Sequence, residues 1–185
     1  YFLFGRGGCN SAIVQQAAQQ LATGGILDPR VFDKAKVYES LSDDDSKNPL
    51  PESANLQKYA PPVGDQGKQG SCVAWSSAYG ARTILESART GKAPDALKFS
   101  PAFLYNQIGL DGCDGSYINR AMDFMTQKGS VPYEAFPYSD QDCSRQPDQQ
   151  LLSEAQQFRM RGANRLTVGE GTDQIDLRAI KENLS

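Results

Sequence analysis

A cysteine in the setting of a nucleophile is the most informative feature of this sequence. Cys72 follows a glycine-rich run that begins at Pro62, and Gln66 stands six residues before it. A helix is predicted to begin at Cys72, and the positive end of a helix dipole stabilises a thiolate, the reactive form of cysteine. The backbone N–H at this helix start and the side-chain amide of Gln66 are suitable donors for an oxyanion. The pattern therefore predicts nucleophilic catalysis, the alternative being an unreactive buried thiol, which is common for cysteine.

Histidine is absent from the sequence. A catalytic cysteine usually transfers its proton to a histidine, whose imidazole later protonates the leaving group. If Cys72 is a nucleophile, its base must therefore come from outside these 185 residues.

The elements expected to position Cys72 are mostly helical. The helix beginning at Cys72 should extend to about Arg89 and be largely buried, because apolar residues cover much of its circumference. Gly67 and Gly70 in the preceding loop permit close backbone approach. The polar, proline-containing residues 41–52 predict a linker, which divides an extension (1–49) from a main module (50–185). Other helices are expected at 10–24, 29–38, 101–107, 117–128, 150–159 and 176–184, and the best candidate strand is 165–168.

Composition excludes several classes of protein. Apolar residues make up 39% of the chain, which is enough to form a core, and charged residues make up 22%. The net charge is −3, and no dense stripe of lysine and arginine occurs, so we expect no nucleic-acid partner. No apolar stretch is long enough to span a bilayer. Neither acidic clusters nor cysteines have the spacing of a metal site, so we expect no metal and no cofactor.

Five segments together resemble the papain-like (C1 family, clan CA) cysteine peptidases. The segment Gln66-Gly67-x-x-Gly70-Ser71-Cys72 resembles the nucleophile motif of that family. Residues 50–56 (LPESANL) resemble the start of the mature enzyme. Residues 99–105 (FSPAFLY), 112–116 (GCDGS) and 128–138 (KGSVPYEAFPY) follow in the family's order, and the second of these resembles the loop that lines the substrate cleft.

This resemblance implies an α+β papain-like fold, of which the chain carries mostly the helical (left) lobe. It also implies hydrolysis of peptide bonds by a cysteine endopeptidase through a thioester intermediate. Cys72 and Gln66 take the catalytic positions, with the amide of Gln66 and the N–H of Cys72 facing the oxyanion. The implied substrate-binding residues are Gly70, Ser71, Asp114, Gly115, Ser116, Tyr117 and Ile118. Ordinary helix packing is the alternative for Tyr117 and Ile118.

Departures from the family pattern suggest a divergent, bacterial-type branch and a changed disulfide. Gln69 stands where the family usually has a cysteine, and Cys113 matches the partner of that cysteine. Cys143 matches another family cysteine whose partner is missing here. The resemblance therefore leaves two unpaired positions, and we hypothesise a Cys113–Cys143 disulfide. Ser116 replaces the second glycine of the cleft loop, and its side chain could narrow the cleft.

The histidine and asparagine of the family lie about 130–150 residues after the cysteine. That count passes residue 185, so the resemblance implies that a second chain or a C-terminal lobe supplies them. The alternative is a catalytically inactive peptide-binding or scaffold protein.

Residues 1–49 have no clear counterpart in the family. They could form an inhibitory propeptide or a packed extension, and Cys9 could be unpaired or linked to Cys72 in a latent form. A papain-like protein with a disulfide is expected to be secreted or periplasmic.

Overall fold

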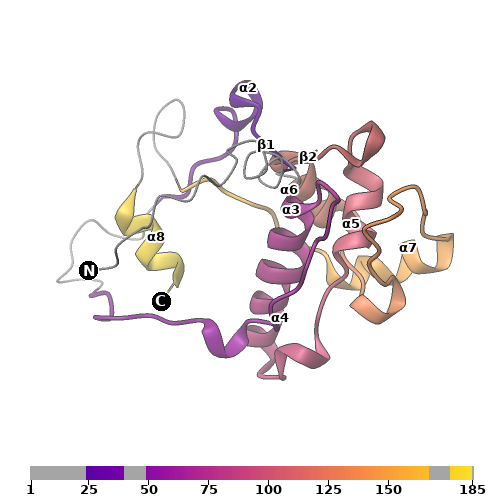
Figure 1. The fold of residues 1–185 in the computed structure, drawn as a ribbon. Helices are drawn as coiled ribbons and strands as arrows, with labels where there is room; N and C mark the ends of the chain where they lie inside the picture. The colour runs from indigo at the N-terminus through magenta and orange to yellow at the C-terminus, as the bar shows by residue number, and fades with distance from the viewer. Residues whose placement is uncertain (1–23, 40–48, 167–175, 185) are drawn as a thin grey trace, which may run out of the picture.

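The computed structural model describes residues 24–39, 49–166 and 176–184. The helix predicted at 10–24 lies almost wholly outside these residues, as does half of the candidate strand at 165–168. Helices dominate the described part of the chain (Figure 1). In chain order the elements are β1 (Gly25–Ile26), α2 (Pro29–Phe32), η1 (Gln57–Tyr59), α3 (Cys72–Ala74), η2 (Trp75–Arg82), α4 (Thr83–Thr90), η3 (Pro94–Ala96), α5 (Pro101–Ile108), η4 (Asp111–Cys113), β2 (Ser116–Tyr117), α6 (Ile118–Gln127), η5 (Tyr133–Ala135), α7 (Gln149–Ala155), η6 (Gln156–Phe158) and α8 (Leu177–Leu184).

One long helix runs from Cys72 to Thr90 through α3, η2 and α4, close to the predicted extent. Its middle part, η2, has wider π-helical turns. At their start the hydroxyl of Ser77 donates to the carbonyl oxygen of Val73. The helix ends at Gly91, whose left-handed backbone (φ 70°) suits glycine. Cys72 therefore stands at the N-terminal end of the longest helix described, as the sequence predicts.

Helix α5 lies at the centre of the helical body and is buried on both sides. The Ser100 side chain accepts a hydrogen bond from the N–H of Phe103, and Pro101 occupies the first turn, so local sequence fixes the helix start. One face of α5 packs with the nucleophile helix and α6, and the other with residues 131–136 and α7. The first cluster comprises Val73, Ala74, Ala78, Leu104, Tyr105, Ile108, Ala121 and Met125, and the second Ala102, Phe103, Val131, Phe136 and Ala155.

The N-terminal segment departs from its predicted helical structure. We expected a helix over 29–38, but α2 ends at Phe32, although Asp28 caps it as predicted. Residues 33–35 form a turn, after which Val37 forms a parallel bridge with Arg165, and the flanking backbone groups of Lys36 and Tyr38 bond to the same residue. The two-residue strand β1, which the sequence did not suggest, pairs in parallel with β2. Tertiary pairing thus replaces local helix propensity in this segment.

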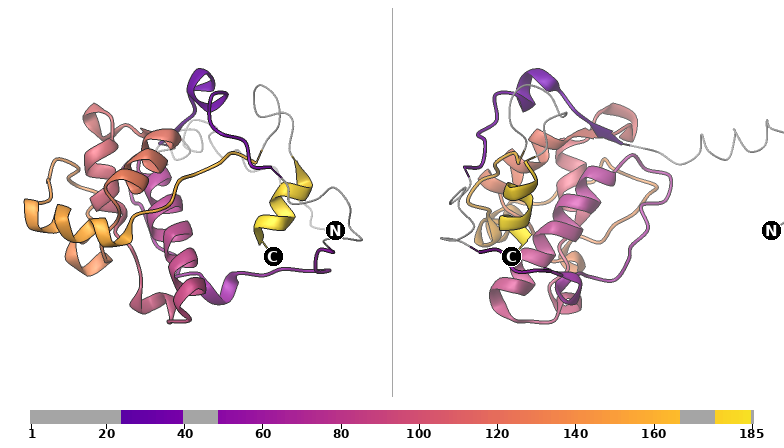
Figure 2. Two further views of the ribbon diagram at one scale, coloured as in Figure 1. Left: turned by 180° about the vertical axis from the view of Figure 1, so that it is seen from behind. Right: turned by 90° about the vertical axis from the view of Figure 1, so that its left-hand side faces the viewer.

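Helix α8 stands apart from the helical body. Two views show it set away from the body, with residues 49–56 running past it on one side and the N-terminal segment and residues 160–166 on the other (Figure 2). A cavity of about 560 Å³ lies between α8 and the segment before η1, and it is lined by residues 49–54, Arg178, Lys181 and Leu184. Leu177 is 67% exposed, and of the α8 residues only Ala179 is buried.

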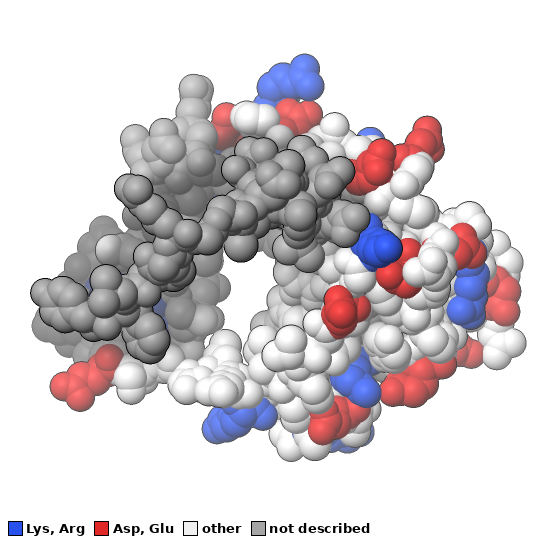
Figure 3. Space-filling model, viewed as in Figure 1, with Lys and Arg blue, Asp and Glu red and all other residues white. Residues whose placement is uncertain are grey.

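The surface seen in Figure 3 carries acidic and basic side chains interspersed over the helical body, without a large patch of either sign. This agrees with the small net charge of the chain. In the part of the chain that the structure describes, no helix has the length and apolar character needed to cross a membrane.

Candidate active site

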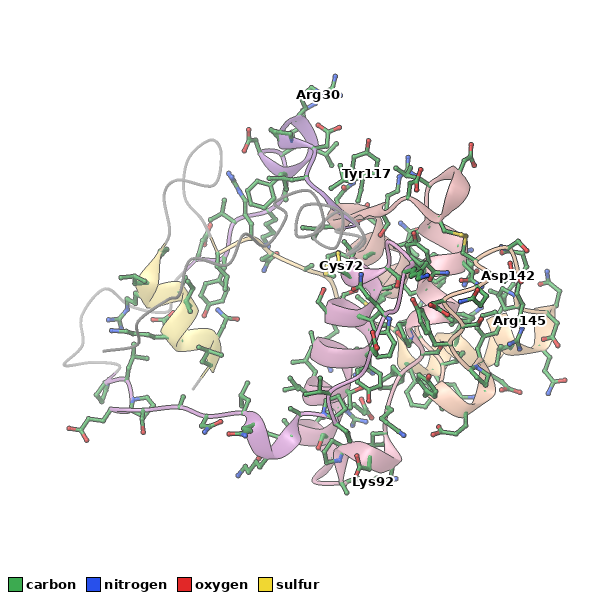
Figure 4. The ribbon with its side chains drawn as sticks, in the orientation of Figure 1. Arg30, Cys72, Lys92, Tyr117, Asp142 and Arg145 are labelled. Atoms are coloured by element: carbon green, nitrogen blue, oxygen red, sulfur yellow. A yellow bond between two sulfur atoms is a disulfide. The ribbon has the colours of Figure 1, made fainter. Side chains whose placement is uncertain are left out.

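Cys72 lies at the N-terminal end of the long helix and is partly exposed. Figure 4 shows it beside the loop that carries Tyr117, at the opposite end of the helix from Lys92. Among the described residues it is the only cysteine outside a disulfide. The position at the helix start is as predicted, and stabilisation of a thiolate there by the first-turn N–H groups stays a prediction.

Gln66 is fixed beside the helix start by hydrogen bonds at both ends of the residue. Its side-chain amide donates to the carbonyl oxygen of Gln69 at 3.1 Å. Its own carbonyl oxygen accepts a hydrogen bond from the hydroxyl of Tyr138 at 2.8 Å. The glutamine therefore belongs to the same compact loop as Cys72, and its role toward an oxyanion stays a prediction.

Ser71 precedes the nucleophile and is fully buried, with its hydroxyl 2.6 Å from that of Tyr138. This bond explains why the Ser71 side chain does not cap the helix, as serine at this position otherwise often does. Burial raises the pKa of Tyr138. Tyr138 was not predicted as a supporting residue, although it lies in one of the segments that carry the family resemblance.

The cleft loop packs directly against the nucleophile loop. The N–H of Gly70 donates to the carbonyl oxygen of Cys113 at 3.2 Å. A Cβ atom on Gly70 would lie 2.8 Å from the backbone nitrogen of Gly115, so only glycine permits this approach. The hydroxyl of Tyr105 accepts from the N–H of Gly115 at 3.0 Å, which ties the cleft loop to α5. Tyr105, which is fully buried, is a second supporting residue that the sequence analysis did not identify.

The predicted Cys113–Cys143 disulfide is present, with a Cα–Cα distance of 6.1 Å. It joins η4, at the base of the cleft loop, to the segment that follows Tyr138. Gln69, at the position where the family usually has a cysteine, is 97% buried, and its side-chain amide donates to the carbonyl oxygen of Ser139 at 3.4 Å. The disulfide and this hydrogen bond therefore connect the cleft loop and the nucleophile loop to the same third segment.

The N-terminal segment lies across the thiol. Gly25 pairs with Ser116, whose N–H donates to the carbonyl oxygen of Gly24 at 2.8 Å. A Cβ atom on Gly25 would lie 3.5 Å from the sulfur of Cys72, so the backbone of Gly25 passes beside the nucleophile. A Cβ atom on Gly24 would lie 1.7 Å from the carbonyl oxygen of Gly70, which no side chain can tolerate.

The predicted substrate-binding residues gather around this segment on two sides. Asp114 and Gly70 line a polar cavity of about 440 Å³ together with Gly24. Ile118 is 45% exposed and lines a cavity of about 450 Å³ on the other side, with Leu27 and Met122. Tyr117 is not among the residues lining either cavity. Instead, the guanidinium of Arg120 lies over its ring at 5.0 Å from the centroid. Ser116 is fully buried beneath the N-terminal segment.

Comparison with known proteins gives the family of this arrangement. The sequence pattern of the papain family cysteine proteases matches residues 50–176, which is more than half of the chain. The chain belongs to the papain family of cysteine proteases. Cathepsin K of Mus musculus is 38% identical over 99 residues, which cover 51% of this chain and 29% of that protein. Cathepsin K of Gallus gallus is 36% identical over 122 residues, which cover 65% of this chain and 35% of that protein. The chain thus matches about a third of the length of these two relatives.

Solved structures show that the fold is papain-like. Xylellain, a cysteine protease from Xylella fastidiosa, aligns with a TM-score of 0.62 and 22% identity over 88% of this chain and 62% of that chain. A structure from a study of the mite allergens Blo t 1 and Der p 1 aligns with a TM-score of 0.52 and 23% identity, over 72% of this chain and 43% of that chain. The prediction of a papain-like fold represented mainly by its helical lobe is therefore confirmed.

Proposed function

We propose that this papain family protein hydrolyses peptide bonds by nucleophilic catalysis at Cys72. The thiolate attacks the scissile carbonyl carbon, the amine leaves with a proton from an imidazolium, and water hydrolyses the resulting thioester. The observation that carries the proposal is the placement of a partly exposed cysteine, outside any described disulfide, at the start of a long helix beside the cleft loop. Its substrates are peptides or proteins.

The remaining roles follow from the loops around Cys72. Its backbone N–H and the amide of Gln66 stabilise the oxyanion, while Gly115 and Ser116 hold the substrate backbone. The hydrogen bond from the N–H of Ser116 to the carbonyl oxygen of Gly24 supports this last role, because here the cleft loop bonds to a segment of this chain through its backbone. The bond from Gln66 to Gln69 keeps the amide close to the helix start.

The histidine and its orienting asparagine are supplied by a second lobe or chain outside these residues. The absence of histidine from the sequence requires an external base for this mechanism. Helix α8 and residues 49–54 support a location for the partner, because they stand away from the helical body and leave Leu177 and Leu184 partly uncovered.

Mutation of the nucleophile tests the proposal in the natural protein together with the lobe or chain that supplies the histidine. Cys72→Ala should abolish hydrolysis of a fluorogenic peptide library, whereas Ser76→Ala, which changes an exposed residue one turn along the helix, should leave it intact. If the wild-type protein binds peptides but cleaves none, it is a catalytically inactive peptide-binding protein and the proposal is wrong.

Residues 1–49 act as a propeptide-like segment that keeps the site latent. Support comes from Gly25, which lies over the thiol, and from the carbonyl oxygen of Gly24, which bonds to Ser116. Because the cleft loop bonds to this segment and the segment passes beside the thiol, it occupies the place that a substrate would take.

Two neighbouring glycines provide a matched test of latency. Gly24→Ala places a methyl group against the Gly70 carbonyl and should release the segment, so alkylation of Cys72 by iodoacetamide should become at least several-fold faster. Gly25→Ala makes only an ordinary 3.5 Å contact with the sulfur and should change the rate little. Equal rates in wild type and Gly24→Ala would contradict the proposed latency.

The protein functions outside the cytosol, secreted or in a periplasm. The Cys113–Cys143 disulfide supports this location, because such bonds persist in oxidising compartments. Detection of the protein by immunoblotting of secreted and periplasmic fractions, against a cytosolic marker, tests it.

A further inference from the structure

The Tyr138 hydroxyl connects the residue before the nucleophile to the proposed oxyanion-binding glutamine. It lies 2.8 Å from the carbonyl oxygen of Gln66 and 2.6 Å from the hydroxyl oxygen of Ser71. A carbonyl oxygen can only accept, so the tyrosine proton is committed to Gln66. The Ser71 hydroxyl must then donate to the tyrosine oxygen. The result is a directed chain of hydrogen bonds from Ser71 through Tyr138 to Gln66.

This chain has a rigid setting. Ser71 is fully buried, and the ring of Tyr138 meets the ring of Trp75 edge-on, with centroids 4.9 Å apart. Burial raises the pKa of Tyr138, so its hydroxyl keeps its proton and remains a donor at neutral pH. Hydrogen bonds in such an enclosed network have strongly limited geometry.

The two ends of Gln66 are held by different partners. Tyr138 fixes its backbone carbonyl, and the carbonyl of Gln69 fixes its side-chain amide. Ser71 is bonded covalently to Cys72, so one tyrosine sets the distance between the loop that carries the amide and the residue that carries the thiol. Oxyanion stabilisation depends on donors already in place when charge develops.

We infer that Tyr138 is a positioning residue for peptide hydrolysis, which aligns Gln66 with Cys72 for oxyanion stabilisation without touching the substrate. The inference rests on the proposed function of Cys72 and Gln66. It assigns to the tyrosine hydroxyl an effect on acyl transfer that is separable from the reactivity of the thiol.

Tyr138→Phe tests this in the full-length protein, since it removes the hydroxyl and keeps the ring against Trp75. All variants are activated by the same limited proteolysis. We expect kcat for a fluorogenic peptide to fall about tenfold with KM unchanged, less than the roughly 100-fold cost of losing an oxyanion donor outright. Alkylation of Cys72 by iodoacetamide creates no oxyanion, so its rate should match wild type.

Tyr79→Phe is the matched control. The Tyr79 hydroxyl also donates to a backbone carbonyl, that of Pro62 at 2.9 Å, and its ring also packs on Trp75. Its loss should lower stability similarly and leave kcat unchanged. Ser71→Ala breaks only the first bond of the chain and should give a smaller loss of kcat, about threefold, again with normal alkylation. If Tyr138→Phe does not fold, the kcat of Ser71→Ala tests the inference instead.

Three results would overturn the inference. The first is an unchanged kcat in Tyr138→Phe or, if that variant does not fold, in Ser71→Ala. The second is an equal loss of kcat in Tyr79→Phe. The third is a parallel fall in alkylation rate, which would indicate a displaced thiol rather than a displaced glutamine. A wild-type protein that hydrolyses no peptide would refute the proposed function itself, and with it the inference, whereas the first three results leave that function standing.

Discussion

Helices α5 and α8 have the same length, eight residues, but very different surroundings. Both begin with a side-chain cap, Ser100 to the N–H of Phe103 in α5 and Asp176 to the N–H of Ala179 in α8. Six residues of α5 are buried, compared with one of α8. Local sequence signals are therefore enough to define a helix in both places, but only the helical body supplies the packing that stabilises it.

Glu182 of α8 takes part in two polar contacts. Arg178 pairs with Glu182 at 2.9 Å within the helix, and the hydroxyl of Tyr38 donates to Glu182 at 3.3 Å. Ion pairs of this kind within one helix stabilise it by only a few tenths of a kcal/mol. The helical body, in contrast, has a continuous apolar core around α5. The comparison implies that free energy of unfolding is concentrated in the helical body, and four variants examine this.

Phe103→Ala should have the largest effect. Phe103 is 1% exposed and packs edge-on against the rings of Phe124 and Phe136. Removing a buried aromatic ring leaves a cavity and costs about 4 kcal/mol. Urea denaturation followed by circular dichroism measures the loss. A loss below about 1 kcal/mol would show that the helical body is not the stable region.

Removing the disulfide should rank second. Cys113 and Cys143 are 30 residues apart, and a crosslink over a loop of this size stabilises by about 3 to 4 kcal/mol through the unfolded chain. The double variant Cys113→Ala/Cys143→Ala should lose this amount in the same denaturation experiment. Because the disulfide anchors the cleft loop, the rate at which iodoacetamide alkylates Cys72 should also change. A double variant as stable as wild type would place the cleft loop outside the stable region.

Glu86→Gln should rank third, with a defined pH dependence. Glu86 is bonded to Arg89 and to buried Arg82. The hydrogen bond from Arg89 is the largest cause of its lowered pKa, assisted by Arg82 and opposed by burial. A carboxylate whose pKa is lower in the folded state than in the unfolded state stabilises the fold at pH values above its unfolded pKa of about 4.3. This stabilisation disappears as the pH falls through the folded-state pKa.

The expected loss for Glu86→Gln is about 3 kcal/mol at pH 7, because Arg82 keeps a buried charge without its partner. It should shrink as pH falls below about 4. Glu134→Gln is the control, since Glu134 is 71% exposed and pairs with Lys98 only at 3.6 Å. Its effect should be below about 0.5 kcal/mol at any pH. A loss in Glu86→Gln that does not depend on pH would contradict the assignment to charge.

The predictable parts of this molecule are those fixed by short-range patterns. The glycine after Thr90, the serine-proline pair before α5 and the glycine-rich loop before Cys72 each indicate one conformation. The Cys113–Cys143 disulfide followed from two positions left without partners in the family pattern, and the structure confirms it.

The parts that could not be predicted depend on pairing between distant segments. Residues 29–38 have helical potential, but the helix stops at Phe32, and the backbone of residues 36–38 bonds to Arg165, more than a hundred residues away. Nothing local to Gly24 and Gly25 indicates that they cross the thiol, because the decisive contacts belong to Gly70 and Ser116. The role of Tyr138 was likewise hidden, since its hydroxyl partners lie 67 and 72 residues earlier.

Leu177→Ala should have the smallest effect, and this effect should depend on the rest of the protein. In these 185 residues Leu177 is 67% exposed, so its truncation should cost less than about 0.5 kcal/mol. If the histidine-bearing lobe covers α8, the same change in the full-length protein removes a buried leucine and should cost about 2 kcal/mol or more. Urea denaturation of the variant in both contexts measures the difference. Equal costs would place the partner lobe elsewhere, while a larger cost in the full-length protein would show that α8 forms part of a second core.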